Sequence, residues 1–387
     1  MLRIKMIPFS IRNVAVILMI LRMFLGSATK IFSIPDVVDW TIILLSTILI
    51  VIDFLCRQLY SKKELILVIL ISLVAIISAY LSGEFTLLYS VLLIFVVGRE
   101  NITDFLKRFL PLKVFLMVLI VLLYIAGIAF GSIAISTKNG LTSFTGGFET
   151  GNVFAFVIFW LVMEYMYTRR NDLSIPRIFL CSLFQLFIAR ISGCKTVLYL
   201  SIISCIVLIV LQFRKMPKVG TIFSRFGFVI VGALYYSSVL IFYSGSGILY
   251  YAVYYIDNFL TGRIRNTAYL VSKYGVTIWG NYVQKGTIDY DTYYQLTRVT
   301  VDGGYALLFL QAGVISFILI SFGFILLHKK YKCDDFEIWI ICLFIVYNLS
   351  EVFVMNAFIC FPMLLLGKLI FNSEEYEISI ERNSSLE

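Results

Sequence analysis

Long apolar stretches follow one another along the chain from residue 14 to residue 372, with only short polar breaks between most of them. A helix needs about 20 mainly apolar residues to cross the hydrocarbon layer of a bilayer. The stretches are continuous and lack the alternation of apolar and polar positions that marks the strands of a membrane barrel. The pattern therefore predicts an all-α, polytopic membrane protein.

We expect twelve spans, at residues 14–29, 37–55, 64–81, 85–98, 114–133, 151–168, 178–190, 196–212, 226–245, 304–327, 338–356 and 357–372. The fourth, seventh and twelfth are short, and the pair 178–190 and 196–212 forms either a tight hairpin or a partly re-entrant element. The first stretch also resembles a secretory signal, but the many spans behind it favour an uncleaved first helix.

Composition supports a membrane location, since 60% of the 387 residues are hydrophobic and only 14% are charged. The formal net charge of +9 comes mainly from Lys and Arg in alternate short loops, which places both chain ends in the cytoplasm by the positive-inside rule. The charge is thus a topology signal, and we expect no nucleic-acid partner. The expected location is the cytoplasmic (inner) membrane.

The chain then divides into residues 1–245 with nine spans, an outer loop at 246–303, three spans at 304–372 and a cytoplasmic tail at 373–387. The outer loop is far longer than the other connections and rich in tyrosine, so we expect it to fold as a small helical cap. Its tyrosines suit either sugar rings or the lipid headgroup region.

Several kinds of chemistry are disfavoured by what the sequence lacks. His328 is the only histidine and lies on the expected cytoplasmic side, so no His-ligated metal or His-based triad is expected on the outer face. No phosphate-binding loop of the P-loop type occurs. Of seven cysteines only Cys194 is expected to face outward, which excludes a disulfide framework, and we expect no metal and no cofactor.

The stretch LTGRIRNTAYLVSKYG, residues 260–275, predicts a short helix with Thr261 as its N-cap and Gly275 just beyond its end. Arg263 and Arg265 fall in the first turn, where positive side chains oppose the helix dipole. A docked anion such as a pyrophosphate would explain them, because free N–H groups and guanidinium groups both bind phosphate. The alternative is a pair of solvated loop arginines.

Further polar residues are expected on the outer side. Arg190 and Lys195 flank the turn in ARISGCKT. They either hold phosphate or only extend to the membrane interface and help to set the orientation of the helices. Asp302, before Gly303 and Gly304, is a candidate general base or a plain turn residue. Within the spans, ionisable groups at Arg22 and Glu351 suggest a functional or paired role, with Asn348 on the same helix face as Glu351 and an Arg22–Glu351 pair as one option.

Three motifs carry a family resemblance. They are TGGFETGN, ending at Asn152; SGCKT, residues 192–196; and an outer loop that opens with TGR, residues 261–263, and closes with VDGGY, residues 301–305. With the architecture, they make the chain resemble the Wzy-type polymerases of bacterial O-antigen, capsular polysaccharide and exopolysaccharide, within the O-antigen polymerase and ligase group.

The resemblance implies a glycosyltransferase that joins undecaprenyl-pyrophosphate-linked oligosaccharide repeat units on the outer face of the membrane by inverting, metal-independent transfer. It implies Arg263 and Asp302 as catalytic residues. The substrate and pyrophosphate would be bound by Arg265, Asn266, Arg190, Lys195, Asn152, Tyr269 and Tyr305. A chain-length regulator, a flippase and membrane lipid are the further expected partners.

Gly303 stands where relatives commonly carry Asn or His, and the lack of that histidine favours a polymerase over an O-antigen ligase. The alternative from another class is a lipid-linked oligosaccharide flippase or other multi-pass transporter, although paired repeats and broken helices are not evident in the sequence. A membrane scaffold or an acyltransferase fits less well, because acyltransferases generally use a histidine within the membrane.

Overall fold

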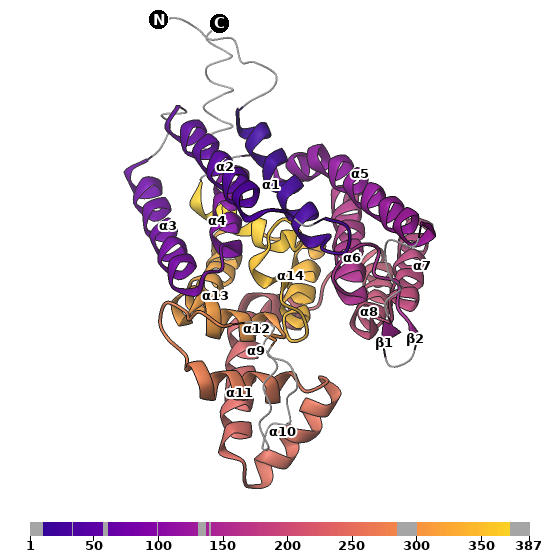
Figure 1. The fold of residues 1–387 in the computed structure, drawn as a ribbon, viewed down its shortest axis with the longest axis vertical. Coiled ribbons are helices and arrows are strands. Elements are labelled where there is room, and N and C mark those ends of the chain that lie inside the picture. The colour runs from indigo at the N-terminus through magenta and orange to yellow at the C-terminus, as the bar shows by residue number, and fades with distance from the viewer. Residues whose placement is uncertain are drawn as a thin grey trace, which may run out of the picture. The chain divides into compact units, whose positions relative to one another are not determined.

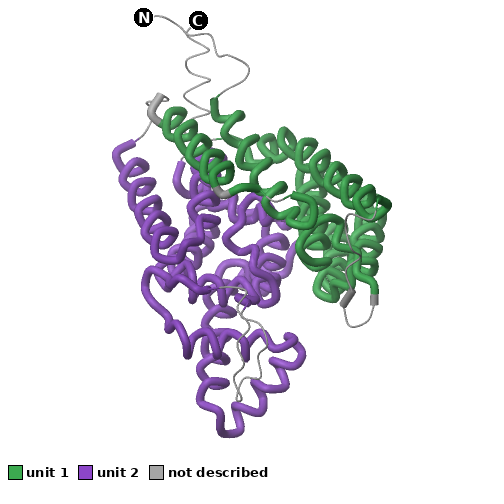
Figure 2. Tube along the Cα trace, viewed as in Figure 1, with its two compact units in different colours: residues 1–60, 100–214 green, residues 61–99, 215–387 purple. Residues whose placement is uncertain are grey.

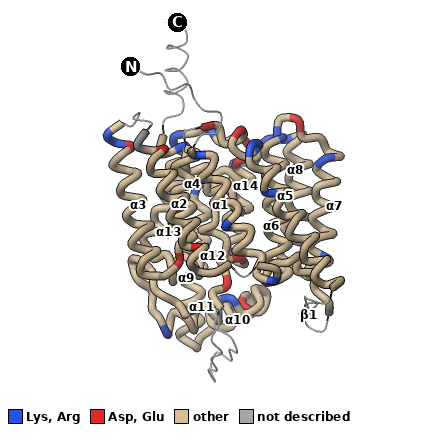
Figure 3. Tube along the Cα trace, turned by 45° about the horizontal axis from the view of Figure 1, so that its top comes forward, with Lys and Arg blue, Asp and Glu red and all other residues tan. Residues whose placement is uncertain are grey.

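The computed structural model describes residues 11–32, 34–56, 61–98, 100–130, 137–138, 141–284 and 300–371. These residues are almost wholly helical, which confirms the all-α prediction, and they divide into two compact units (Figures 1 and 2). Residues 285–299 of the predicted cap and the predicted tail lie outside the described residues. Most charged residues lie at or near helix ends (Figure 3).

Unit 1 comprises residues 1–60 and 100–214. Its helices are α1 (Ile11–Ser27), α2 (Asp36–Cys56), α5 (Ile102–Ala129), α6 (Gly151–Thr168), the one-turn η1 (Arg170–Asp172), α7 (Ile175–Ser192) and α8 (Lys195–Leu211). The two-residue strands β1 (Thr137–Lys138) and β2 (Leu141–Thr142) pair antiparallel. Helices α7 and α8 pack together as a hairpin, one of the two forms expected for this pair.

Unit 2 comprises residues 61–99 and 215–387. It holds α3 (Lys62–Ser82), α4 (Thr86–Val97), α9 (Lys218–Ser244), α10 (Ile248–Phe259), α11 (Arg263–Tyr274), α12 (Gly304–Leu307), the π-turn η2 (Leu308–Ala312), α13 (Val314–Lys330), α14 (Asp335–Tyr347), η3 (Phe353–Met355), η4 (Phe361–Leu366) and α15 (Gly367–Ile370). The ring of Phe228 on α9 packs against those of Tyr305, Phe317 and Phe344, which joins α9 to α12, α13 and α14.

The expected count of twelve spans is not supported. Among the described residues six helices are long and apolar enough to cross a membrane, namely Val37–Phe54 of α2 together with α3, α5, α6, α7 and α9. Thr86–Val97, Lys195–Leu211 and Phe361–Ile370 are apolar but shorter. Six such helices in one chain indicate a multi-pass membrane protein, as predicted.

The last three predicted spans are interrupted rather than continuous. The predicted span 304–327 breaks at Gly313, whose φ of 81° lies in the left-handed region. A Cβ at Gly313 would meet the Ile278 carbonyl oxygen at 2.3 Å, so only glycine allows this close approach of two backbones. The segment after α11 binds here, with the amides of Val314 and Ile315 donating to the carbonyls of Thr277 and Ile278 at 3.1 Å each.

The predicted spans 338–356 and 357–372 contain α14, followed by mostly buried backbone in which non-helical residues alternate with the short helices η3, η4 and α15. We call residues 348–366 the broken segment. Non-helical backbone at membrane depth requires partners from the protein, because hydrocarbon offers none. Ser90 on α4 supplies them: its hydroxyl donates to the Met355 carbonyl and accepts from the Ala357 amide at 2.9 Å, while the Asn356 side chain accepts from the Phe358 and Ile359 amides at 3.2 Å.

This arrangement predicts that Ser90→Ala destabilises unit 2. The substitution leaves two buried backbone groups without their partner, and an unsatisfied buried group costs about 1–3 kcal/mol. We expect the free energy of unfolding in mild detergent to fall by at least that amount. The control Ser237→Ala changes an exposed side chain on α9 and should have little effect; equal stabilities for the two variants would contradict the assigned role of Ser90.

Candidate functional site

The start of α11 is built differently from the prediction. Gly262, not Thr261, is the N-cap of α11, with φ 82° and ψ 14°. Because glycine has no side chain, the N-cap residue itself cannot bind the free amides of the first turn. The neighbouring Thr261 also has a positive φ, 59°. Asp257 on α10 takes over the capping, because its Oδ1 accepts from the amide of Ile264 at 2.8 Å and of Arg265 at 3.2 Å.

This carboxylate corrects one part of the predicted anion site. Two of the α11 amides that were expected to receive a phosphate already bind Asp257, whose side chain is buried. Burial raises the pKa of Asp257, and the hydrogen bonds from the two amides and the charge of Arg265 act in the opposite direction. The helix start is thus stabilised internally by Asp257, which occupies two of the amides expected to bind an anion.

Arg263 forms a mostly buried ion pair. Its Nη2 donates to Oε1 of Glu351 at 3.0 Å, and the two side chains are only 15% and 8% exposed. The Nη1 atom is at 3.4 Å from Oγ1 of Thr261. The pair joins α11 to the broken segment, so a charge from the predicted loop and a charge from a predicted span compensate each other.

The suggested Arg22–Glu351 pair is therefore wrong. Arg22 on α1 instead donates to both carboxylate oxygens of Asp39 on α2, at 2.8 Å each. Asn348 and Glu351 also do not share a helix face, since α14 ends at Tyr347. Asn348 instead accepts the amide of Gly304 at 2.8 Å through its backbone carbonyl, and thereby ties the end of α14 to the start of α12.

Asn266 links α11 to the predicted catalytic carboxylate. It lies one turn after Arg263, and its Nδ2 donates to Oδ2 of Asp302 at 3.3 Å and also to the backbone carbonyl of Thr300. The Thr300 hydroxyl donates to the same Asp302 oxygen at 2.9 Å. Asp302 itself is exposed. The structure thus brings Asp302 within hydrogen-bond distance of Asn266, which follows Arg263 by one turn on α11.

Tyr235 and Thr267 complete this cluster, and the sequence analysis missed both. The Tyr235 hydroxyl on α9 hydrogen-bonds the Thr267 hydroxyl at 2.7 Å, and it would lie 3.8 Å from a Cβ on Gly303. Tyr235 gave no signal because a tyrosine in an apolar run is indistinguishable from core. We call Tyr235, Arg263, Asn266, Thr267, Thr300, Asp302 and Glu351 the α11 cluster.

Two predicted ligand residues lie in the core instead. Tyr305 is fully buried, and its hydroxyl donates to the Ile345 carbonyl at 3.2 Å. Tyr269 is 6% exposed, and the Lys273 ammonium lies over its ring, 5.9 Å from the ring centre. The most exposed described tyrosines of the predicted cap are Tyr251, Tyr255 and Tyr282, which are 64%, 74% and 65% exposed.

Unit 1 brings the other two motifs together at the end of the α7–α8 hairpin. The Ser143 hydroxyl donates to the Ser192 carbonyl at 2.8 Å, and a Cβ on Gly151 would meet that oxygen at 2.4 Å. Asn152 lies in the first turn of α6, which Thr150 caps. Arg190 and Lys195, on either side of the hairpin turn, are exposed. This is a second basic location, in a different unit from the α11 cluster.

The α11 cluster offers a cation, Arg263 on α11, and an exposed carboxylate, Asp302, that is hydrogen-bonded to the same helix through Asn266. Guanidinium groups bind and stabilise phosphate oxygens, and a carboxylate in hydrogen-bond reach of a hydroxyl can accept its proton. Within the described residues no three His, Cys, Asp or Glu side chains are grouped so as to hold a metal ion.

Comparison with known proteins gives no match to a family model, to a curated protein or to a solved structure. The chemical reading of the cluster therefore depends on the geometry described above.

The capping role of Asp257 predicts a pH dependence. Because its pKa is raised on folding, the folded chain binds the proton more tightly than the unfolded chain, whose aspartate pKa is about 3.9. The contribution of this residue to stability therefore falls as pH rises from that value through the raised one. Asp257→Asn should remove this slope in detergent unfolding measurements, whereas Asp172→Asn, at an exposed position, should keep it. A wild-type slope of opposite sign that Asp257→Asn abolishes would refute the assignment.

Proposed function

We propose that this chain is a membrane glycosyltransferase that joins lipid-linked oligosaccharide repeat units, as the resemblance to Wzy-type polymerases implies. The observation that carries the proposal is the hydrogen bond from Asn266, three residues after the TGR motif, to Asp302 of the VDGGY motif, 36 residues further along the chain. The expected orientation would place this cluster on the outer side of the cytoplasmic membrane, where an undecaprenyl-pyrophosphate-linked unit is available.

The charge balance of the cluster defines how a pyrophosphate would bind. Asp257 caps the helix and Glu351 pairs with Arg263, so a phosphate must compete with a carboxylate for that guanidinium. The Nε atoms of Arg263 and Arg265 are buried and have no hydrogen-bond partner among the described residues. Multivalent phosphate oxygens would offer acceptors for such forked donors better than a single carboxylate. Glu351 would then keep Arg263 in place between turnovers.

The proposed reaction needs one cation and one base. A sugar hydroxyl of the acceptor attacks the anomeric carbon of the donor glycan, the bond from that carbon to the pyrophosphate oxygen breaks, and the lipid pyrophosphate leaves with the electron pair. Asp302 takes the hydroxyl proton, and its exposed position supports access to a bulky acceptor. Arg263 stabilises the charge of the leaving group, a task that a preorganised cation does well. No metal is required in this scheme.

Two observations favour a transporter or flippase as the second candidate. The broken segment places irregular backbone among apolar helices, as discontinuous transporter helices do. In unit 1, Lys113 on α5 and Glu164 on α6 form a buried ion pair at 2.8 Å, with side chains 3% and 1% exposed. Ionisable groups buried between membrane helices often mark transport pathways. The cluster at the VDGGY motif has no part in that account, so we place it second.

Replacing Arg263 with alanine should abolish polymer without affecting the supply of repeat units. Losing a preorganised charge partner typically lowers kcat by about 100-fold to 1,000-fold. In cells that carry the matching pathway, we expect single repeat units on the outer surface and no ladder of longer chains on a gel. Lys273→Ala, at the other end of α11, is the matched control and should retain the ladder.

This experiment also separates the alternatives. A flippase defect would remove single units from the outer surface as well, whereas a ligase defect would leave lipid-linked polymer that is not transferred onward. A normal ladder in the Arg263→Ala strain would remove the polymerase proposal.

Asp302→Asn should lower the turnover rate much more than substrate affinity. The amide still accepts from Thr300 and keeps the local geometry, but it cannot take a proton at neutral pH. General base catalysis contributes about 100-fold to 10,000-fold. With purified protein and a lipid-linked repeat unit we expect kcat to fall by roughly that range with KM nearly unchanged. Asp172→Asn serves as the exposed control, and an unchanged kcat for Asp302→Asn would exclude Asp302 as the base.

A further inference from the structure

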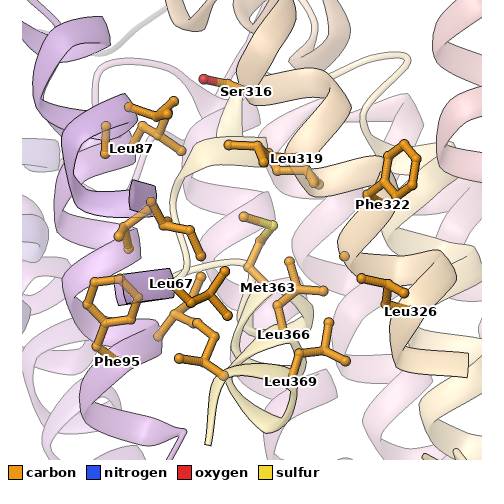
Figure 4. A pocket seen from close by; sticks show the side chains of 18 of the residues that line it. Leu67, Leu87, Phe95, Ser316, Leu319, Phe322, Leu326, Met363, Leu366 and Leu369 are labelled. Carbon is orange, nitrogen blue, oxygen red and sulfur yellow. The ribbon is translucent and has the colours of Figure 1, made fainter. Parts of the chain in front are cut away.

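A second feature of unit 2 lies apart from the α11 cluster. A groove between α3, α4, α13 and the η4–α15 region is lined almost wholly by apolar side chains, among them Leu67, Phe95, Leu319, Leu326 and Leu366. Figure 4 shows these side chains pointing into one space, with Leu87 and Ser316 at one end and Phe95 and Leu369 at the other. No member of the α11 cluster lines it.

One end of the groove is cationic. Lys330, the last residue of α13, lines the groove and is exposed, and His328 and Lys329 share its helical turn. Lys62 and Lys63 form the first turn of α3, one turn before the groove residue Leu67, and both are exposed. The Ser78 hydroxyl, near the end of α3, donates to the carbonyl of Ala312, just before α13, so the two helices run antiparallel and their basic ends flank the same end of the groove. The opposite end has only the Ser316 hydroxyl among its labelled polar groups.

The dimensions suit one hydrocarbon chain. From Ser316 to Lys330 the helix advances fourteen residues, about 21 Å at 1.5 Å per residue. Half of a bilayer core is about 15 Å deep. A single acyl chain entering beside Lys330 can therefore follow the groove through its own leaflet, with its headgroup left at the lysine.

We propose that this groove binds one anionic phospholipid of the bilayer, with an acyl chain between α4 and α13 and the headgroup phosphate on Lys330. Charge complementarity selects this occupant: an anionic headgroup gains roughly fivefold in binding for each lysine near the surface. A polyprenyl substrate would place its pyrophosphate at the α11 cluster, which is not part of the groove. The proposal depends on the membrane location and not on the proposed enzyme activity.

The contrast with unit 1 supports the role of charge. A groove between α5, α6 and α7 is also apolar, with Leu122, Phe154 and Phe184 among its lining residues, but no Lys or Arg lines it. Such a surface offers nothing that selects one lipid headgroup over another, and ordinary bilayer chains would cover it. Lys330 is what makes the unit 2 groove a specific site.

Native mass spectrometry of the full chain tests the proposal. The purified protein, delipidated in mild detergent, is mixed with equal amounts of phosphatidylglycerol and phosphatidylcholine that carry the same acyl chains. We expect one phosphatidylglycerol to be retained in preference. Lys330→Gln should reduce this preference about fivefold, whereas Lys329→Gln, one residue earlier and outside the groove lining, should affect it less.

Blocking the groove provides the second arm. Leu319→Trp should abolish retention of both lipids, and Ile318→Trp, a neighbouring exposed position that does not line the groove, should not. Leu326→Trp is a second blocking variant in case the first one unfolds, with thermal unfolding as the check. The proposal is overturned if folded blocking variants retain phosphatidylglycerol as wild type does, if Lys330→Gln leaves the preference unchanged, or if polyprenyl phosphate displaces phosphatidylglycerol from the groove.

Discussion

Wherever a helix of this protein breaks among apolar side chains, the backbone N–H and C=O groups at the break need hydrogen-bond partners from the protein itself. Hydrocarbon and packed apolar side chains provide none, so each helix break must be matched by a specific donor or acceptor. Ser90 and Asn356 meet this need in the broken segment, and the carbonyls of Thr277 and Ile278 meet it beside Gly313. The local structure of unit 2 follows from these matches.

The breaks also determine which polar side chains can meet. Had α14 continued beyond Tyr347, Glu351 would have stayed on the face of a helix; the turn after α14 instead brings it to Arg263 on α11. The left-handed Gly303 similarly ends one segment and starts α12, which leaves Asp302 outside the core and beside Asn266. The candidate site is thus assembled from the ends of elements, where loops on a rigid frame commonly carry function.

Charge compensation is the second theme. A buried guanidinium without a partner is strongly unfavourable, and Glu351 offsets that cost for Arg263 as Asp257 does for the start of α11. In an arrangement already balanced in this way, an external anion would have to displace the carboxylate from the guanidinium group. Lys113 and Glu164 show the same compensation between two helices of unit 1.

The sequence alone determined the helical class, the membrane character and most helix positions, because length and apolar composition act locally and need no knowledge of neighbours. Two short motifs also drew attention to Arg263 and Asp302, and the structure connects their segments through Asn266. Tertiary structure decided the rest: Gly313 and the end of α14 interrupt spans that hydropathy predicts as continuous, since apolar residues suit buried irregular backbone equally well. The partner of Glu351 depended on which segments touch, and no periodicity encodes that contact.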